Sequence, residues 1–384
     1  MATALKGELS HLKEEMARFA KQHIASRDDL HALDAFPRDI WGKMGEENLL
    51  GINLPKEYGG RGGNSLSLAV AGEILTQKGH NLGIAVSWLI HHVVSRFLIM
   101  DFGDNRQHEM YLNRLASGRI TPSIAVSEPK RGTHPKYIET SANRQGDSFV
   151  LNGEKTYLTN GPIADLFIVI GITEVSEGKK RFTAFIVPKE TEGLSLTEPM
   201  KLDFFRPAPH GGIVLSRCLV PASNILGKEG FAYEKMVKPF RDMEDALMMG
   251  PMIGGIESQF EVLLSLIVKQ GIDKTDDLKK DLGRLQSIIH TLRIIAYEGA
   301  SMVDSPVKHP EFLSLLVSFR HLSRQFQDLF ELLVDSAGIE YNTALHRITN
   351  DMVHGIGIGK NIAQLKLKKI GEKRLSGKES DELA

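Results

Sequence analysis

The sequence contains little cysteine, little net charge and no long hydrophobic run. Cys218 is the single cysteine among 384 residues, so no intrachain disulfide can form, which fits a reducing compartment. The formal net charge is −1 and no basic face stands out, which argues against a nucleic-acid partner. No run of about 18 or more apolar residues occurs, and the first residues carry charges where a signal peptide carries an apolar core. We therefore expect a cytoplasmic protein without a membrane segment.

The remaining composition is that of an ordinary globular protein. Charged residues make up 25% of the chain and apolar residues 42%. A chain of 384 residues is long enough for two or three domains with a sizeable core. The spacing of the apolar residues changes twice along the chain, and these changes divide it into three regions.

The first region, residues 1–118, has the apolar period of helices. The segment 64–78 begins with residues that cap helices well and then carries its apolar side chains on one stripe. The segment 84–101 is apolar nearly all round, which predicts a buried helix. His91 and His92 lie in this segment and are interpreted as packed, hydrogen-bonded residues rather than ligands.

The middle region, residues 119–230, has short β-branched runs such as LFIVIGIT and FTAFIVP separated by turn signals. Its Asn152–Gly153 pair is a hairpin signal. We expect an antiparallel β domain here, a sandwich or a small barrel. Residues 231–384 return to a helical period, in four runs that predict a four-helix bundle: 233–268, 276–303, 309–336 and 343–372. The predicted fold class is α+β, with an N-terminal helical domain, a middle antiparallel β domain and a C-terminal four-helix bundle.

A glycine-rich stretch near the C-terminus, DMVHGIGIGKNIAQLK (351–366), looks at first like a phosphate-binding loop. A Walker A loop requires a glycine where this chain has His354, and a serine or threonine where it has Asn361. A dinucleotide fingerprint requires its third glycine where this chain has Lys360, and no strand is predicted before it. A plain loop between helices is therefore preferred over nucleotide binding by this loop alone.

Five motifs, in order and at normal spacing, resemble motifs of the acyl-CoA dehydrogenase family. They are LPKEYGGRGG (54–63), FGDNRQHEMYLNRLASGRI (102–120), AVSEPKRGTHP (125–135), LNGEKTYLTNGPIADL (151–166) and VPASNILGKEG (220–230). The order helical, β, helical is also that of the family. Each motif alone is weak, but together they identify the chain as a divergent member of this family of flavoproteins.

The resemblance implies FAD as cofactor and an acyl-CoA or acyl-carrier thioester as substrate. In the family, a carboxylate removes a proton from the α-carbon while a hydride leaves the β-carbon for the flavin. Hydroxyl groups and backbone donors along the edge of the flavin fix its orientation and its electronics. The resemblance also implies a tetramer and an electron-transfer flavoprotein as electron acceptor. The residues that match the family's flavin contacts are Val126, Ser127, Gly132, Thr133, Tyr157 and Thr159.

The chain departs from the family at the usual catalytic base. In many members the loop reads Ile-Tyr-Glu-Gly-Thr and its glutamate is the base, whereas this chain has Ile358 at that position. In branches resembling the isovaleryl and long-chain enzymes, the base lies on the first helix of the bundle. Aligning the small-residue run 250–254 with that pattern places Glu244 at the base, and Arg241 can replace the family's neighbouring arginine from one turn earlier. Glu244 is the predicted base, because an apolar pocket raises the pKa of a carboxylate toward neutrality; the alternative is an exposed helix carboxylate.

The motifs with which the family's bundle holds FAD are mostly lost. Lys269 is the cation nearest in the sequence to the position of the family's arginine, but a lysine lacks the bidentate fork of arginine. Leu332 and Asp335 stand where the family has a glutamine and a glycine. In the motif AVSEPKRGTHP (125–135), which corresponds to the family's flavin-contacting loop and is called the flavin loop below, Arg131 replaces a small residue. Because the β-domain motifs are kept and the bundle motifs are lost, we expect a heteromer completed by a related subunit, with a homo-oligomer as the alternative. A catalytically silent subunit and a different flavin reaction on the same fold remain open interpretations.

Overall fold

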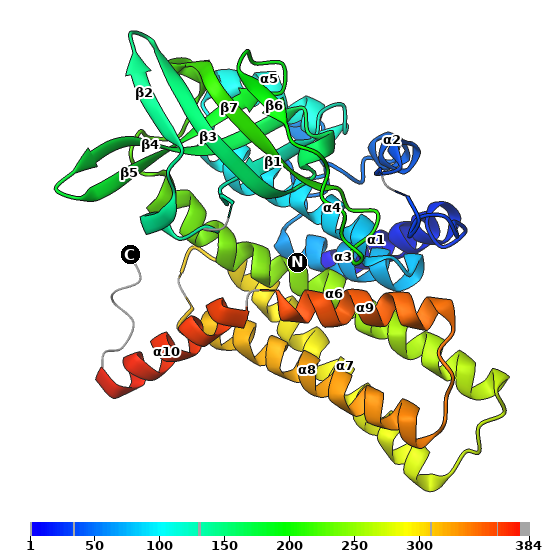
Figure 1. Cartoon of the computed structure of the whole chain (residues 1–384). Helices are drawn as coiled ribbons and strands as arrows, with labels where there is room; N and C mark the ends of the chain where they lie inside the picture. The colour runs from blue at the N-terminus through cyan, green and yellow to red at the C-terminus, as the bar shows by residue number, and fades with distance from the viewer. Residues whose placement is uncertain (1, 34, 130–131, 308, 359, 377–384) are drawn as a thin grey trace. The chain divides into compact units, whose positions relative to one another are not determined.

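The computed structural model describes residues 2–33, 35–129, 132–307, 309–358 and 360–376 (Figure 1). Its contacts divide the chain into two compact units. The helical unit comprises Met1–Arg27, Ser65–Ala85 and Asp245–Ala384, and the sheet unit comprises Asp28–Asn64 and Val86–Glu244. Helices α4 (Leu82–Val94) and α6 (Lys238–Lys269) each contribute residues to both units.

The helical unit is built from long helices that pack side against side. Helix α3 packs against α1 and α7, and α8 packs against α7, α9 and α10. The Thr275 hydroxyl caps α7 and the Asn342 side chain caps α9, each accepting a backbone N–H of the first turn. The bounds are α1 (Ala2–His23), α3 (Ser65–Gly79), α7 (Asp276–Val303), α8 (Phe312–Ser336), α9 (Thr343–Gly357) and α10 (Lys360–Ser376).

The small residues of α6 allow it to approach α3 closely. A Cβ on Gly250 would lie 2.3 Å from the Ala69 carbonyl oxygen, and a Cβ on Gly254 would lie 2.2 Å from the Glu73 carbonyl oxygen. Any larger side chain at these positions would therefore push the two helices apart. The run 250–254 is thus explained by packing within the helical unit.

The single helix predicted over 343–372 is two helices. Helix α9 ends at Gly357, and Ile358 has an extended backbone with φ −61° and ψ 133°. Helix α10 begins at Lys360. Gly355 and Gly357 lie in the last turn of α9, and glycines are poor helix formers. Most of the stretch 351–366 is therefore helical, and the link between the two helices is shorter than the loop predicted from the sequence.

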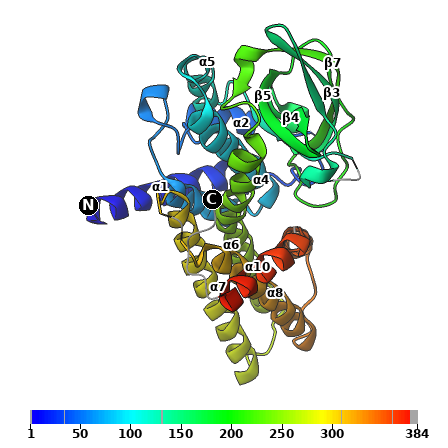
Figure 2. The same ribbon diagram turned by 90° about the vertical axis from the view of Figure 1, so that its left-hand side faces the viewer.

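The sheet unit contains a single, mostly antiparallel sheet. Its strand order is β6-β7-β3-β2-β4-β5-β8, and β1 pairs with β4 in parallel. The sheet curls over a core that includes Phe149, Phe167, Phe185 and Cys218 (Figure 2). Burial raises the pKa of Cys218 to about 11, so this thiol is a packed core group. The strands are β1 (Pro122–Ala125), β2 (Ser141–Gln145), β3 (Ser148–Thr159), β4 (Leu166–Ser176), β5 (Lys179–Pro188), β6 (Leu194–Leu196), β7 (His210–Pro221) and β8 (Ile225–Leu226).

The hairpin predicted at Asn152–Gly153 is wrong. Strand β3 runs through this pair without a break, and its register against β7 shifts there. Gly153 has φ +152°, and a Cβ on it would lie 2.5 Å from the Thr140 hydroxyl oxygen. The Asn152 side chain accepts a hydrogen bond from the Arg217 backbone N–H at 2.8 Å. The pair therefore forms a β-bulge with close backbone packing, and the hairpin between β2 and β3 turns at Gly146 instead.

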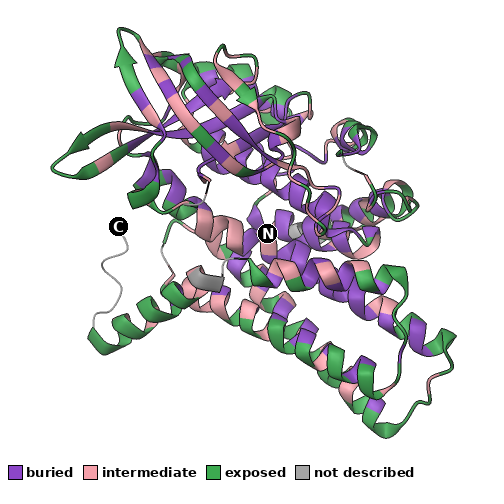
Figure 3. Cartoon of the chain, viewed as in Figure 1, coloured by how far each residue is buried: buried purple, intermediate pink, exposed green. Residues whose placement is uncertain are grey.

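Helical segments also belong to the sheet unit: α2 (Arg38–Glu46), the π-helical turn Ser95–Met100 that continues α4, and α5 (Asn105–Ala116). His91 and His92 are fully buried in α4, as predicted, and bind backbone carbonyls of Leu115 and Leu49. By length and composition, Leu82–Met100 and Tyr233–Lys269 could cross a membrane. However, 94% and 72% of their apolar windows are buried inside the structure, which is typical of core helices (Figure 3).

Candidate functional site

The loop that follows β1 lies directly beside β3. A backbone N–H of β3 donates to the Ser127 carbonyl at 2.9 Å, and the Lys155 ammonium donates to the Val126 carbonyl at 3.1 Å. The loop turns back at Gly132, which has φ +63° and exchanges two backbone hydrogen bonds of 3.1 Å with Glu128. The structure thus brings three of the predicted flavin-contacting residues to one edge of β3. Arg131, a predicted departure from the family motif, lies outside the described residues.

Tyr157 is turned outward by a bulge in β3. The register between β3 and β7 shifts between Lys155 and Leu158, and Tyr157 has φ +59°, which is rare for an aromatic residue. Its side chain is 61% exposed although its two chain neighbours are more buried. Strained backbone and an exposed aromatic side chain are features that structures retain at binding sites. The ring offers a flat apolar face, and the backbone of the preceding residue, Thr156, is hydrogen-bonded to the loop at Ser127.

A buried ion pair anchors this loop to β3. Lys155 Nζ lies 3.0 Å from Glu128 Oε1, with the two side chains 0% and 7% exposed. The same carboxylate accepts the backbone N–H groups of Glu139 and Thr140 and the Thr140 hydroxyl. Burial lowers the pKa of Lys155 to about 8 despite the attraction of the carboxylate. Burial alone would raise the pKa of Glu128, but Lys155 and these donors hold it below its usual value, so the pair is ionised at neutral pH.

The Thr159 hydroxyl is bound by a histidine on the neighbouring strand. Thr159 and His210 are paired across β3 and β7, and Thr159 Oγ1 lies 3.1 Å from His210 Nε2. The other ring nitrogen, Nδ1, lies 3.1 Å from the Ala208 carbonyl oxygen. Burial lowers the pKa of His210, which keeps the imidazole neutral at pH 7. The Ser123 hydroxyl donates to the Thr159 carbonyl at 2.8 Å, so Thr159 is held from both sides.

Arg241 of α6 reaches the second half of the loop. Its guanidinium donates to the Thr133 hydroxyl oxygen at 2.6 Å, and the Tyr233 hydroxyl donates to the Thr133 carbonyl at 3.1 Å. Glu244 is half-buried one turn after Arg241, on the same face of the helix. Within the sheet unit, this face of α6 is therefore the one that carries a contact to the predicted flavin loop.

Ile358, at the position of the family's usual glutamate, follows α9 directly. Its side chain is 54% exposed. The Arg320 guanidinium of α8 donates to the carbonyl oxygens of Ile356 and Ile358, and so fixes the backbone at the end of α9. An isoleucine cannot accept a proton, so this position supplies no base. Gly359 and the Lys360 side chain lie outside the described residues.

Other bundle positions also lack the family's groups. Lys269 is exposed, Leu332 is 67% exposed and Asp335 is exposed. Asp245, which follows Glu244, is bound by the Lys366 ammonium at 2.6 Å. Its charge is therefore already engaged within the helical unit.

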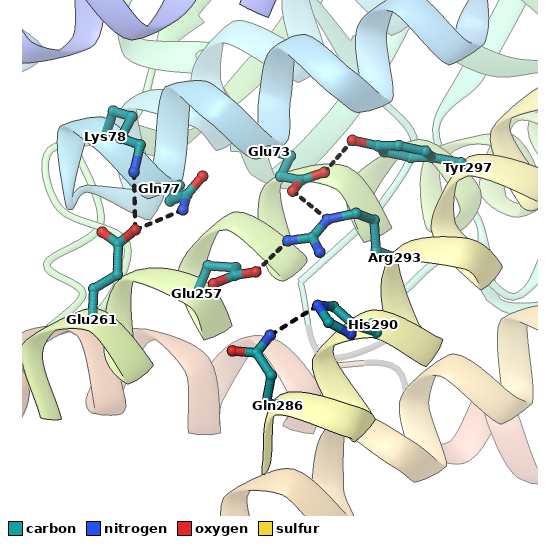
Figure 4. A network of polar contacts seen from close by, with 9 residues as sticks. All are labelled: Glu73, Gln77, Lys78, Glu257, Glu261, Gln286, His290, Arg293 and Tyr297. Carbon is teal, nitrogen blue, oxygen red and sulfur yellow. Dashed lines mark hydrogen bonds and ion pairs between the residues drawn. The ribbon is translucent and has the colours of Figure 1, made fainter. Parts of the chain in front are cut away.

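A second polar cluster lies within the helical unit, between α3, α6 and α7 (Figure 4). Arg293 donates to Glu73 at 2.8 Å and also to Glu257, while the Tyr297 hydroxyl donates to Glu73 at 2.5 Å. Burial and the nearby Glu73 charge raise the pKa of Tyr297, so it stays a donor. Every group in the cluster is bound by a neighbour of complementary type, so it stabilises the packing of three helices rather than offering a free acid or base.

Glu128, Lys155 and His210 are not among the site residues predicted from the sequence. Lys155 had a signal, because a charged residue inside a strand at an inward position needs a buried partner. His210 had no short-range signal, since its partner Thr159 lies 51 residues away in the sequence.

Domain models of one family match this chain in two segments. The N-terminal domain of acyl-CoA dehydrogenases matches residues 6–119 and the middle domain matches residues 123–218, together more than half of the chain. The mitochondrial isovaleryl-CoA dehydrogenase of Solanum tuberosum is 31% identical over 258 residues, covering 66% of this chain and 62% of that protein. The 3-(aryl)acrylate reductase of Clostridium sporogenes is 34% identical over 223 residues, covering 58% of this chain and 59% of that protein. The chain thus spans about six tenths of the length of these relatives.

Solved structures extend the similarity to the whole chain. Butyryl-CoA dehydrogenase of Megasphaera elsdenii superposes with a TM-score of 0.80 at 21% identity, covering 96% of this chain and 98% of that one. A glutaryl-CoA dehydrogenase of Mycobacterium smegmatis, solved in complex with FADH2, also has a TM-score of 0.80 at 21% identity, covering 97% and 95%. The predicted three-part fold is thereby confirmed. This chain belongs to the acyl-CoA dehydrogenase family.

Proposed function

We propose that this chain binds FAD and takes part in the α,β-dehydrogenation of an acyl-CoA thioester. The observation that carries the proposal is the assembled edge of β3 in the sheet unit. There, a bulge turns Tyr157 outward two residues before Thr159, and the backbone of β3 is hydrogen-bonded to the loop that contains Ser127 and Gly132. Relatives of this chain include an isovaleryl-CoA dehydrogenase and a short-chain acyl-CoA dehydrogenase.

The described residues of this edge fit the ring of a flavin. An isoalloxazine ring is flat, with an apolar face and polar atoms along its edge, and Tyr157 presents an exposed aromatic ring. Val126 and Ser127 bring backbone groups to the same place, while Thr159 and Thr133 add hydroxyl oxygens that neighbouring side chains already hold. When bound, FAD supplies the two-electron acceptor that side chains lack.

The chain's own part in the reaction would be to bind and orient the thioester and to accept its α-proton. Glu244 is the proposed base, because it shares a helix face with Arg241, whose guanidinium contacts the flavin loop. Ile358 stands at the position of the family's usual base and has no group that accepts a proton. The proposed electron acceptor is an electron-transfer flavoprotein, and the proposed location is the cytoplasm.

The test of this role is anaerobic bleaching of the flavin by a panel of acyl-CoAs. Glu244→Gln should slow bleaching by about 100-fold or more while FAD binding is unchanged, because general-base catalysis contributes rates of that order. Asp242→Asn, two residues away on the same helix, is the matched control and should stay within about threefold of the parent chain. Equal rates for Glu244→Gln and the parent would show that Glu244 is not the base.

We further propose that a related subunit completes the site. The helical unit lacks the family's glutamate, arginine and glutamine at the positions now held by Ile358, Lys269 and Leu332. A catalytically silent subunit is the second candidate, favoured by the same replacements. The visible spectrum and mass of the chain purified alone separate these possibilities. A colourless chain that takes up FAD only with its partner supports a heteromer, whereas a homotetramer with one flavin per chain refutes it.

A further inference from the structure

The hydrogen bond between Thr159 and His210 assigns a direction to the Thr159 hydroxyl. His210 Nδ1 lies 3.1 Å from the Ala208 carbonyl oxygen, which can only accept, so Nδ1 must carry the hydrogen. In a neutral imidazole the other nitrogen, Nε2, then has a lone pair and no hydrogen. The Thr159 hydroxyl, 3.1 Å from Nε2, must therefore be the donor of their bond.

In this arrangement the Thr159 hydroxyl can only accept a hydrogen bond from any further partner. A hydroxyl has one hydrogen and two acceptor sites, and His210 takes the hydrogen. Thr159 is half-buried, at the end of β3 where the bulge exposes Tyr157, so its oxygen is positioned to meet a bound molecule. The group that meets it must be an N–H or an O–H.

We propose that His210 acts as a positioning residue that makes Thr159 an acceptor, and so favours the reduced form of a flavin bound here over the oxidised form. This inference rests on the proposed function. Two-electron reduction of an isoalloxazine ring adds N–H groups at positions that carry lone pairs in the oxidised ring. An acceptor hydroxyl is complementary to the reduced ring and faces lone pairs on the oxidised ring. His210 thereby influences the redox balance of the site through the Thr159 hydroxyl.

The first part of the experiment needs no flavin. Long-range ¹H–¹⁵N spectra of the histidine-labelled chain report which ring nitrogen carries the hydrogen, and His210→Gln identifies the signals. We expect the Nδ1–H tautomer at pH 7, and Thr159→Val should move the Nε2 signal toward that of a free lone pair. The Nε2–H tautomer, or no response to Thr159→Val, would overturn the proposal whether or not the chain binds FAD.

The second part measures the dissociation constants of oxidised and reduced FAD. His210→Leu frees the Thr159 hydroxyl to donate, so the preference for reduced FAD should fall by about three- to tenfold, a tenfold change being ~30 mV for a two-electron couple. His210→Gln keeps an acceptor near the Nε2 position and should restore much of the preference. In a Thr159→Val background, His210→Leu should change nothing.

These arms separate the two proposals. If neither redox state of FAD binds the parent chain, alone or with a partner subunit, the proposed function fails, and the inference about the flavin fails with it. If FAD binds but His210→Leu leaves the ratio of the two constants unchanged, the inference alone is overturned. An equal effect of His210→Leu with and without the Thr159 hydroxyl would assign His210 a purely structural role, which also overturns it.

Discussion

Acidification should destabilise the sheet unit through two histidines that are buried without charge. His91 and His92 are both fully buried in α4. Burial lowers the pKa of His91 from 6.5 to about 4, and burial together with the neighbouring His91 lowers the pKa of His92 well below 6.5. Between the folded and unfolded pKa values, the unfolded chain therefore binds more protons than the folded chain. Stability contributed by these groups is present above about pH 6.5 and is lost as the pH falls toward 4.

The magnitude follows from the two pKa values of His91. With 6.5 in the unfolded chain and about 4 in the folded one, protonation linkage costs little at pH 7 and about 2 kcal/mol at pH 5. His91 alone should thus remove just under 2 kcal/mol between these pH values, and His92 adds to the loss in the same direction. A loss of this size is a large fraction of the stability of an ordinary domain.

The two tryptophans provide the assay. Trp41 packs edge-on against His91 with ring centroids 5.3 Å apart, and Trp88 packs against His92 at 4.6 Å. Both tryptophans lie in the sheet unit, so their fluorescence during urea unfolding reports on that unit. His91→Gln should lower stability at every pH because it disturbs the core. It should also reduce the loss between pH 7 and pH 5 by about 2 kcal/mol relative to the parent chain.

The control is His346→Gln, at an exposed position of α9, which should leave the pH dependence unchanged. The comparison uses the difference between two pH values, so the general destabilisation caused by a core substitution cancels. If the parent chain and His91→Gln lose the same free energy between pH 7 and pH 5, within about 0.5 kcal/mol, the assignment of neutral buried histidines is refuted.

Three further substitutions test charge and packing elsewhere. Arg293→Leu removes the cation that neutralises the buried Glu73 and should lower the free energy of unfolding of the helical unit by about 3–5 kcal/mol. Urea denaturation followed by circular dichroism measures this loss, and a loss under about 1 kcal/mol would contradict the ion pair. Gly254→Ala should destabilise the same unit by about 1–3 kcal/mol, because the added Cβ meets the backbone of α3. The control Gly283→Ala, where α7 has open space, should be neutral or stabilising. Equal effects of the two substitutions would argue against a close contact between α6 and α3. For Lys155, whose pKa burial lowers from 10.5 to about 8, the unfolded chain binds more protons between these values. The stability of the parent relative to Lys155→Met should therefore rise by about 1 kcal/mol from pH 8.5 to 9.5, and a flat difference would be evidence against the shift.

Much of the fold could be predicted because it depends on local periodicity. The helical pattern of 276–303 predicted α7 with the bounds that the structure gives. The Asn152–Gly153 hairpin failed because the same dipeptide also suits a bulge, and the sequence does not say that Thr140 packs against this glycine. The single helix over 343–372 failed because apolar spacing continues across a break in the backbone at Ile358.

Within the candidate site, too, only residues that are close together in the sequence could be predicted. Tyr157 and Thr159 could be found from a motif because they are close together in the sequence. The contacts that fix this part of the sheet unit join residues far apart in the sequence: Lys155 meets Glu128 27 residues away, and Thr159 meets His210 51 residues away. Such pairs depend on strand order and register, which a single sequence does not supply. The residues of the proposed flavin edge could therefore be named from a motif, whereas the residues that position them could not.

The polar groups of the two units also differ in what they leave for a ligand. In the sheet unit, Thr159 is held by His210 and Thr133 by Arg241, so these hydroxyls are fixed before any ligand binds. Preorganised groups of this kind lower the cost of ordering on binding. In the helical unit, Arg320 is already engaged by backbone carbonyls at the end of α9, and Ile358 there has no polar atom in its side chain. The proposed flavin edge of the sheet unit is thus preorganised, whereas Ile358 offers no polar side-chain group. This difference supports the proposal that a second subunit supplies the missing groups.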